Sequence, residues 1–323
     1  MLGAAVGLWL FAQASPPAAK PPEDCGALYD GDSRRRDLGK ALACYRSQED
    51  WAMVAIMQLN GEAGPVDLAG ARASFQRLIG PGGFKDGDAL ALEAIVEKRE
   101  ASPAHKGPRV DFCKDVAAIT PSLAYCERRN LDRRAAQDDL LLARLRARLE
   151  PRARPAFDGA VGAFRDFIAV EGERVYQEYI DGTIRNQASL AAEAFARASF
   201  MAEMKWLADE AAPTPNPGAR SFGDADRELN AVYQAGLSGY ATTFDGVAKT
   251  GADPATAETY RTYVRDYRTK SHAAQHAWVR YRDAIAKLAM ARWPAAHEAE
   301  ALTRARITED RIRELRPGEG ELR

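Results

Sequence analysis

Four cysteines are the residues of this chain most able to form covalent bonds or to hold a metal ion. They fall in two well-separated pairs, Cys25 with Cys44 and Cys113 with Cys126. Such pairs become disulfides in an oxidising compartment, whereas zinc sites favour cysteines at the close C-x-x-C spacing, which neither pair has. The sequence alone permits three pairings. We predict the disulfides Cys25–Cys44 and Cys113–Cys126, with zinc binding as the competing interpretation.

The first residues predict that the chain is exported. Residues 2–12 form an apolar run, and Ala12 and Ala14 supply the small-x-small pattern of a signal-peptidase site. The run is too short to span a bilayer as a helix, which argues against the alternative of a retained anchor. We expect a signal peptide over residues 1–14, cleaved after Ala14, and an extended proline-containing linker over 15–23. The mature protein is then expected in the periplasm or secreted.

Other patterns that could do chemistry lack the partners that the chemistry needs. His272 and His276 have a spacing that can hold a metal on a helix, but no glutamate lies between them and no third ligand is evident. The Asp-Gly-Asp triplets at 30–32 and 86–88 lack the remaining ligands of a calcium loop, and helix-entry turns explain them. No G-x-S-x-G elbow or Gly-rich phosphate loop occurs. We therefore predict no enzyme activity, no cofactor, and no catalytic, cofactor-binding or metal-binding residue.

The composition excludes several classes of partner. The 323 residues contain 45 Lys+Arg against 46 Asp+Glu, a net charge of −1, which is far from the basic excess expected for binding nucleic acid. Beyond the signal peptide, no apolar run reaches the roughly 20 residues that a membrane helix needs, so we expect no stable membrane insertion. Hydrophobic residues make up 46% of the chain, enough for one or two globular cores.

The spacing of apolar residues predicts an all-α fold. Ala, Leu, Arg and Glu dominate at spacings of three and four, and strand-like alternation is almost absent. Proline and glycine divide the chain near residues 102–108 and again at 213–218. We expect a region of short helical hairpins over 24–101, followed by two antiparallel helical-bundle domains over 111–212 and 219–317. A loop over residues 244–254 is expected to join two long helices of the last domain.

Residues 51–75 resemble a SEL-type repeat, a relative of the tetratricopeptide repeat. In that family a helix rich in small residues leads into a glycine-containing turn and then into a second helix. Here the turn falls at residues 60–66, and Asp67 is the expected N-cap of the second helix. The resemblance implies helices that stack on their neighbours and a surface for protein interactions.

Three motifs in the C-terminal third carry a second resemblance. They are residues 226–233, 274–284 and 308–315, in this order, and together they resemble the LprI-type lysozyme-inhibitor domain. Residues 111–212 resemble a more diverged copy, in which Cys113, Thr120 and Cys126 match the cysteine-bearing start of the domain. Residues 164–166 match its central motif, and residues 182–183 its glycine turn.

The LprI resemblance implies a protein that binds another protein. We expect a periplasmic binding module, a lysozyme inhibitor that acts by occluding the enzyme, with lysozyme or another envelope protein as its partner. An envelope adaptor or scaffold without lysozyme-related activity is the alternative, and an enzyme of unknown type is a third class that a deep polar cleft would favour. Because lysozyme is basic, acids around the second linker, within residues 209–228, are the densest candidates for an acidic patch.

Five residues of the matched motifs are candidates for partner binding. Asn230 could present its amide to a partner or bond between helices. Trp278, Tyr281 and Arg282 lie within one helical turn and could form an exposed aromatic and arginine anchor. The opposing interpretation places Trp278 in the core and pairs Arg282 with Asp283 as a buried or rim ion pair.

Overall fold

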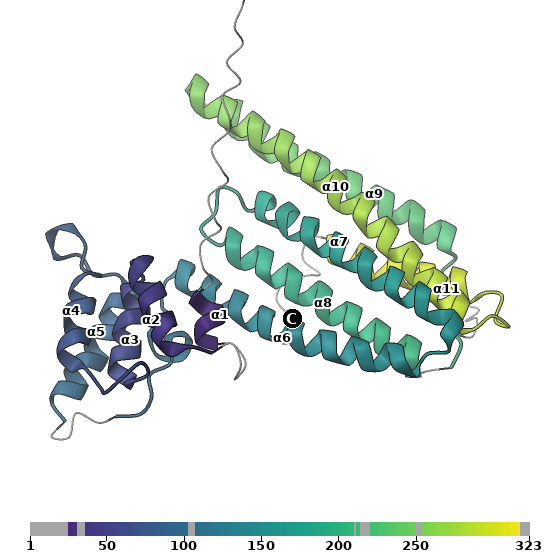
Figure 1. Cartoon of the computed structure of the whole chain (residues 1–323). Coiled ribbons are helices and arrows are strands. Elements are labelled where there is room, and N and C mark those ends of the chain that lie inside the picture. The colour runs from purple at the N-terminus through teal and green to yellow at the C-terminus, as the bar shows by residue number, and fades with distance from the viewer. Residues whose placement is uncertain are drawn as a thin grey trace, which may run out of the picture. The chain divides into compact units, whose positions relative to one another are not determined.

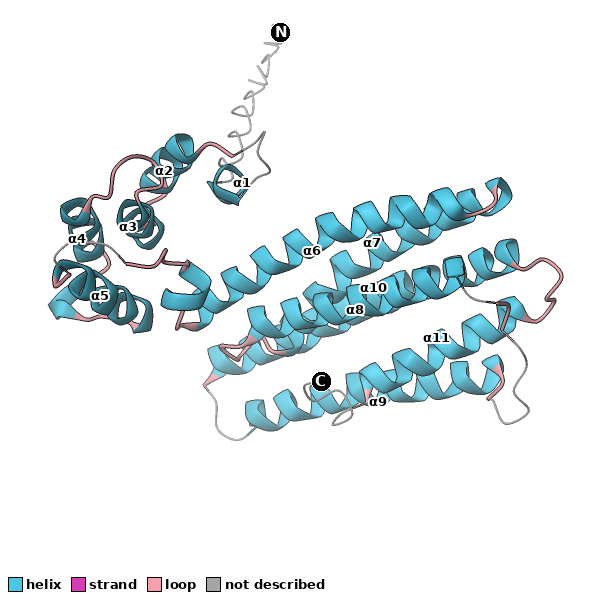
Figure 2. Cartoon of the chain, turned by 90° about the horizontal axis from the view of Figure 1, so that it is seen from below, coloured by secondary structure: helices cyan, strands magenta, loops and turns pink. Residues whose placement is uncertain are grey.

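The computed structural model of the chain describes residues 25–30, 36–102, 107–209, 211–213, 220–249 and 253–316 (Figure 1). Every regular element in this part is a helix, as Figure 2 shows, so the predicted all-α class is confirmed. None of these helices is long and apolar enough to cross a membrane. The chain divides into two compact units, Met1–Ala117 and Ala118–Arg323, here called the N-terminal and C-terminal units. The predicted signal peptide and linker lie outside the described residues and stay predictions.

The N-terminal unit is built from short helices, most of which begin after an aspartate. Its α-helices are α1 (Cys25–Asp30), α2 (Leu38–Ser47), α3 (Trp51–Asn60), α4 (Leu68–Gln76) and α5 (Gly87–Glu100), followed by a single turn, η2 (Phe112–Val116). An aspartate before each of α2 to α5 accepts a hydrogen bond from the backbone N–H three residues on. The predicted N-cap Asp67 accepts from Gly70 at 2.8 Å, and Asp86 caps α5 in the same way. Such a cap contributes about 1 kcal/mol to helix stability.

Each helix of the N-terminal unit packs on the next one along the chain, which is the arrangement of helical hairpins. At the contact between α3 and α4, the absence of a side chain at Gly70 leaves room for the Asp67 carboxylate and the amide of the buried Gln58, both of which an added Cβ would clash with. The Gln58 amide lies 2.8 Å from the hydroxyl of Ser74, so a buried polar contact also joins the pair. The packing is that of helical hairpins, and the SEL-type relationship stays a prediction.

A disulfide joins the first two helices. The sulfurs of Cys25 and Cys44 are bonded, and their Cα atoms lie 5.5 Å apart, which is the first pairing that the sequence predicts. Cys113 and Cys126 are disulfide-bonded as well, so no described cysteine is free. Because zinc binds thiolates, cysteines in disulfides do not support the zinc interpretation.

The described part of the C-terminal unit contains six long helices. They are α6 (Thr120–Arg148), α7 (Arg154–Glu178), α8 (Arg185–Asp209), α9 (Phe222–Lys249), α10 (Pro254–Arg292) and α11 (Ala299–Leu315). Helix α6 packs on α8, α8 on α7, and α7 on α10, while α9 and α11 pack on α10 and on each other. Figures 1 and 2 show these helices running side by side along the unit.

One large hydrophobic core joins all six long helices of the C-terminal unit, and a small separate cluster lies between α6 and α8. The buried residues of the large core extend from Leu142 in α6 to Ile312 in α11 and include residues of every long helix. The structure therefore does not separate residues 111–212 and 219–317 into two bundles with cores of their own. The physical reason is the broad contact between α7 and α10, which merges the apolar faces of the two halves. The tandem relationship of the two halves stays a prediction.

The connection between α9 and α10 is shorter than the expected loop over 244–254. Helix α9 continues through Gly246 to Lys249, and α10 begins at Pro254. Asp253 caps α10 by accepting from the backbone N–H groups of Ala255 and Thr256, and proline suits the first helical position because its missing N–H would have no helical partner there. The two predicted long helices are present, but the loop was placed too early because an isolated glycine does not end a helix.

Candidate functional site

Two of the predicted partner-binding residues lie in the core. Trp278 is 2% exposed and Tyr281 is 8% exposed. The Tyr281 ring lies 5.7 Å from the ring of Phe167 in α7 and 6.1 Å from that of Phe200 in α8. Burial raises the pKa of the Tyr281 hydroxyl above its usual value. The exposed-anchor hypothesis is therefore wrong for Trp278 and Tyr281, because both belong to the hydrophobic core, where Tyr281 packs against α7 and α8.

Arg282 is also buried, within an ion-pair cluster. Its Nη1 donates to Asp226 in α9 at 2.9 Å, and its Nε donates to Asp283 at 3.0 Å. The guanidinium carbon lies 4.9 Å from the ring centre of Phe222 and 5.3 Å from that of Trp278. Arg282 thus connects α10 to the first turns of α9, and Asp283, partly exposed, is one of its counter-charges. These contacts match the interpretation in which Arg282 and Asp283 form an ion pair. Because its guanidinium group is buried, Arg282 is not accessible to a partner.

The acids near the second linker do not form an unbalanced negative patch. Each described acid pairs with arginine: Asp209 with Arg148, Asp224 with Arg227, Asp226 with Arg282, and Glu228 with Arg220 and Arg316. Because each carboxylate faces a positive charge, the local potential available to attract a basic partner is small. The predicted acidic patch is therefore not supported by the described part of residues 209–228.

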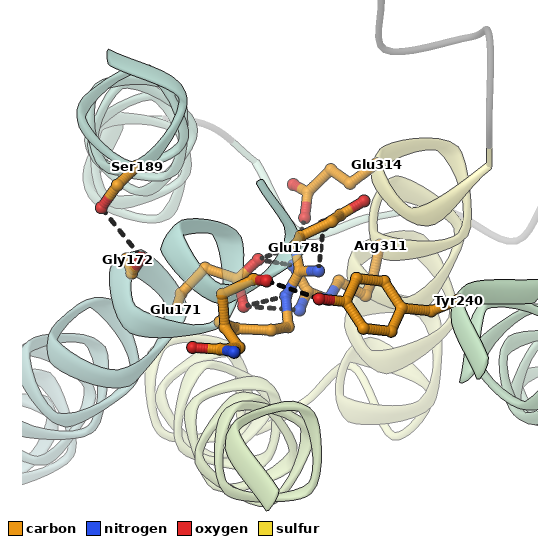
Figure 3. Close-up of polar contacts among 9 residues, drawn as sticks. Glu171, Gly172, Glu178, Ser189, Tyr240, Arg311 and Glu314 are labelled. Carbon is orange, nitrogen blue, oxygen red and sulfur yellow. Dashed lines mark hydrogen bonds and ion pairs between the residues drawn. The ribbon is translucent and has the colours of Figure 1, made fainter. Parts of the chain in front are cut away.

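A buried carboxylate links α7 to α11, as Figure 3 shows. The side chain of Glu171 is 5% exposed and that of Arg311 is 3% exposed. Arg311 donates to both oxygens of Glu171, from Nη1 at 3.0 Å and from Nη2 at 2.9 Å. Arg174 donates to the same two oxygens, at 2.8 Å and 3.1 Å. One buried carboxylate therefore accepts four hydrogen bonds from two guanidinium groups.

Two more acids balance the charge of this cluster. Glu178 accepts from Arg174 at 2.7 Å, and Glu314 accepts from Arg311 at 2.9 Å. Burial alone would raise the pKa of Glu171, but the positive charges of Arg174 and Arg311 and the hydrogen bonds they donate outweigh burial. The pKa of Glu171 consequently lies well below its usual value of 4.5. For Glu314, burial dominates and raises the pKa.

Acidification is expected to weaken the contribution of Glu171 to the stability of the folded state. A carboxylate whose pKa is depressed in the folded state stabilises that state above its unfolded pKa and loses this contribution as the pH falls toward the folded pKa. Glu314 and Glu203 have pKa values raised by burial, so lowering the pH is expected to increase their contributions to the stability of the folded state. The test is urea unfolding of the wild type and Glu171→Gln between pH 7 and pH 3. We expect the stability gap between them to be largest at pH 7 and to shrink below about pH 4.5. A gap that stays constant would contradict this assignment.

Tyrosines of α9 attach this helix to its neighbours. The Tyr240 hydroxyl donates to the backbone carbonyl of Gln177 at 2.9 Å (Figure 3), and its ring stacks on that of Tyr267 with centres 3.9 Å apart. The Tyr233 hydroxyl lies 3.0 Å from Nδ1 of His272. Burial raises the pKa of the Tyr233 hydroxyl to about 12. His272 is thus a hydrogen-bond partner of α9. No group of three or more metal-ligating side chains occurs in the described part of the chain.

The opposite side of α9 presents an uncharged surface. Residues 229–244 contain no charged side chain, although 28% of the whole chain is charged. We call the exposed residues of this stretch the α9 outer face: Asn230, Ala231, Gln234, Ala235, Gly236, Ser238, Gly239, Thr242 and Thr243. Of the five predicted partner-binding residues, Asn230 alone belongs to it. The others of this face were missed, and the uncharged run between Glu228 and Asp245 is the sequence signal that could have found them.

Three glycines leave the backbone of α9 without side chains at their positions. An added Cβ at Gly236, Gly239 or Gly246 would meet no atom within 4 Å, so no contact inside the described structure requires glycine there. Glycine in a helix interior costs about 0.5–1 kcal/mol relative to alanine. The hydroxyls of Thr242 and Thr243 donate to backbone carbonyls one turn earlier, which satisfies them within the helix. A partner could therefore approach the α9 backbone closely.

The hollows described in the C-terminal unit are open to solvent. One, of about 360 Å³, lies between α6 and α8 beside Tyr125, Arg128 and Asn186. Another, of about 380 Å³, lies beside Tyr176 and Lys270. Helix α8 borders both through Ser189, which donates to the carbonyl of Gly172 at 2.8 Å (Figure 3). Neither hollow is the deep cleft with convergent acids or histidines that would favour the enzyme alternative.

The geometry defines a class of helical module for the C-terminal unit: α10 packs on α7, and α9 and α11 pack on α10 and on each other. A buried ion pair links α11 to α7, and α9 presents an uncharged outer face. The family model described as lysozyme inhibitor LprI matches residues 216–315, which contain α9, α10 and α11 and about a third of the chain. The match confirms the resemblance for the second predicted domain, whereas the resemblance of residues 111–212 stays a prediction. No curated protein and no solved structure matches the chain.

Proposed function

We propose that this protein is an exported binding protein that inhibits a lysozyme-type enzyme by covering its surface with the α9 outer face. The supporting observation is the position of this uncharged, glycine-containing face inside the segment that matches the lysozyme-inhibitor model. Proteins leave helix-destabilising glycines where a backbone must be approached closely, and interface centres are depleted of charge. LprI is an inhibitor family, which agrees with a binding function and not with catalysis.

Export is part of the proposal. Disulfides form and persist in oxidising compartments such as the periplasm and the extracellular space. The bond between Cys25 and Cys44 is therefore compatible with the predicted signal peptide and with a partner outside the cytoplasm.

The proposal predicts that Gln234→Arg weakens inhibition. The mature chain should reduce the lysis of bacterial cell walls by at least one lysozyme type at a near-stoichiometric ratio. Arginine at position 234 would place an unpaired charge in the centre of the interface and should weaken inhibition at least tenfold, about 1.4 kcal/mol or more. The measurement is residual wall lysis as the inhibitor concentration is varied.

Gln137→Arg is the matched control. Gln137 is an exposed helical glutamine of α6, outside the segment that matches the inhibitor family. The control variant should inhibit like the wild type. If the wild type leaves every lysozyme tested active at tenfold excess, lysozyme inhibition is wrong and the adaptor alternative is favoured. If both arginine variants inhibit equally well, lysozyme inhibition stands and the α9 outer face is the wrong surface.

A further inference from the structure

In the N-terminal unit, residues 107–111, which have no regular structure and lead into η2, lie against α3 and α5 and are held through their backbone. The side-chain amide of Asn60 makes two hydrogen bonds with Val110: the Val110 N–H donates to Oδ1 at 2.8 Å, and Nδ2 donates to the Val110 carbonyl at 2.8 Å. Asp111 next to it has extended backbone angles. A side-chain amide that pairs with both backbone groups of one residue can hold an extended peptide of many sequences.

Other groups extend this contact in both directions. Arg99 in α5 is buried and donates to the carbonyl oxygens of Leu59 and Pro108. Val110 and Phe112 are both buried. Asn60, Arg99 and the pockets for these two apolar side chains therefore form a site that fits an extended segment, here called the strap site. The segment that fills it, residues 107–112, is here called the strap.

The strap leaves one group of this site unsatisfied. Arg109 donates from Nε at 2.8 Å to Oε1 of Glu62, and its Nη2 lies 2.7 Å from the same oxygen. Tyr29 and Asn60 donate to Oε1 as well, at 3.1 and 3.3 Å. The Glu62 side chain is only 7% exposed, and its Oε2 is buried without a hydrogen-bond partner among the described residues. An arginine that made a bidentate pair, with one hydrogen bond to each carboxylate oxygen, would satisfy Glu62 better than Arg109 does.

We propose that the strap site is a peptide-binding site for an extended segment of a partner protein, and that the strap occupies it in its absence. The ligand chemistry follows from the contacts: an arginine for Glu62, then an aliphatic residue at the position of Val110, and an aromatic residue two positions later at that of Phe112. The strap competes because it is tethered to the site, and tethering gives effective concentrations in the millimolar range. A partner segment displaces it by satisfying Oε2 of Glu62. This site is independent of the α9 outer face.

The test uses the full mature chain and a fluorescently labelled peptide with the sequence of residues 107–112. In the double variant Arg109→Ser and Val110→Ser, the strap loses its ion pair and its buried side chain, so the site should open. Peptide binding, followed by fluorescence anisotropy, should be at least tenfold tighter to this variant than to the wild type. Adding Asn60→Ala should weaken binding to the opened variant at least tenfold. A peptide with glutamate at its arginine position should not bind.

The single variant Arg109→Ala keeps the test informative if the double variant does not fold. The Arg109 side chain is 57% exposed, so removing it should disturb the unit little while weakening the strap. The proposal is overturned if neither opened variant binds the peptide with a dissociation constant below about 1 mM, which is already a weak affinity, or if binding is unchanged by Asn60→Ala. Because the two sites are separate, Asn60→Ala should leave lysozyme inhibition unaltered, which distinguishes a failure of this proposal from a failure of the proposed function.

Discussion

Replacing Glu171 by glutamine is expected to lower the free energy of unfolding of the C-terminal unit by about 3–5 kcal/mol, the usual effect of removing one partner of a buried ion pair. Both guanidinium groups bonded to Glu171 would remain buried, with only Glu178 and Glu314 to balance them. The measurement is urea unfolding at pH 7 followed by far-UV circular dichroism. An unfolding midpoint close to that of the wild type would contradict the assigned role of the cluster.

Glu173→Gln is the matched control. Glu173 lies two residues further along α7 and pairs with Lys270, but both side chains are exposed. Exposed ion pairs contribute about 0–1 kcal/mol, so the control should remain close to the wild type. A double-mutant cycle adds a sharper test: Glu171→Leu combined with Arg311→Met should cost less than the sum of the single changes, because the double variant leaves fewer buried charges without partners.

The second large effect is expected from Phe200→Ala. Phe200 is fully buried in α8 and stacks on Phe164 in α7, with ring centres 4.0 Å apart. It also contacts Tyr281 in α10. Truncating a buried phenylalanine costs about 3–5 kcal/mol, because apolar contacts are lost and a cavity remains. Since one core joins all six helices, the variant should lower the stability of the whole C-terminal unit in a single transition.

Tryptophan fluorescence can follow this transition. In a Trp51→Phe background, the emission of the mature chain comes from Trp206 in α8, Trp278 in α10 and Trp293, which follows the end of α10. Phe195→Ala is the control on the same helix, because Phe195 is exposed and its loss should change stability by about 0.5 kcal/mol or less. Two separate transitions, one of them with the wild-type midpoint, would instead show that the two halves fold independently, as the predicted pair of bundle domains requires.

The sequence predicted the helical fold and parts of its local structure correctly. The period of the apolar residues indicated helices throughout, and Asp67 marked the start of α4 through its carboxylate, which can accept a backbone hydrogen bond. The spacing of the cysteines favoured the bond between Cys25 and Cys44. The motifs of residues 226–315 pointed to the family whose model matches them. These features are local, so the chain carries their signal within a few residues.

The candidate binding residues could not be placed in the same way. A helical period shows that Trp278 and Tyr281 share a face of α10, but it does not show whether another helix covers that face. The structure places both residues in the core, with Tyr281 packed against α7 and α8. Asn230 lies on a face of α9 that none of the described helices covers. Its amide alone does not reveal this, because a buried asparagine carries the same group.

By itself, the sequence determined that this protein is helical, where several of its helices begin, and that its last third resembles lysozyme inhibitors. Only the tertiary structure decided that the two halves of the C-terminal unit share one core, that Glu171 meets Arg311 140 positions away, and which side of α9 stays open. The reason is physical: caps, turns and helical faces depend on neighbouring residues, whereas burial and ion pairing depend on which distant helix packs against each face.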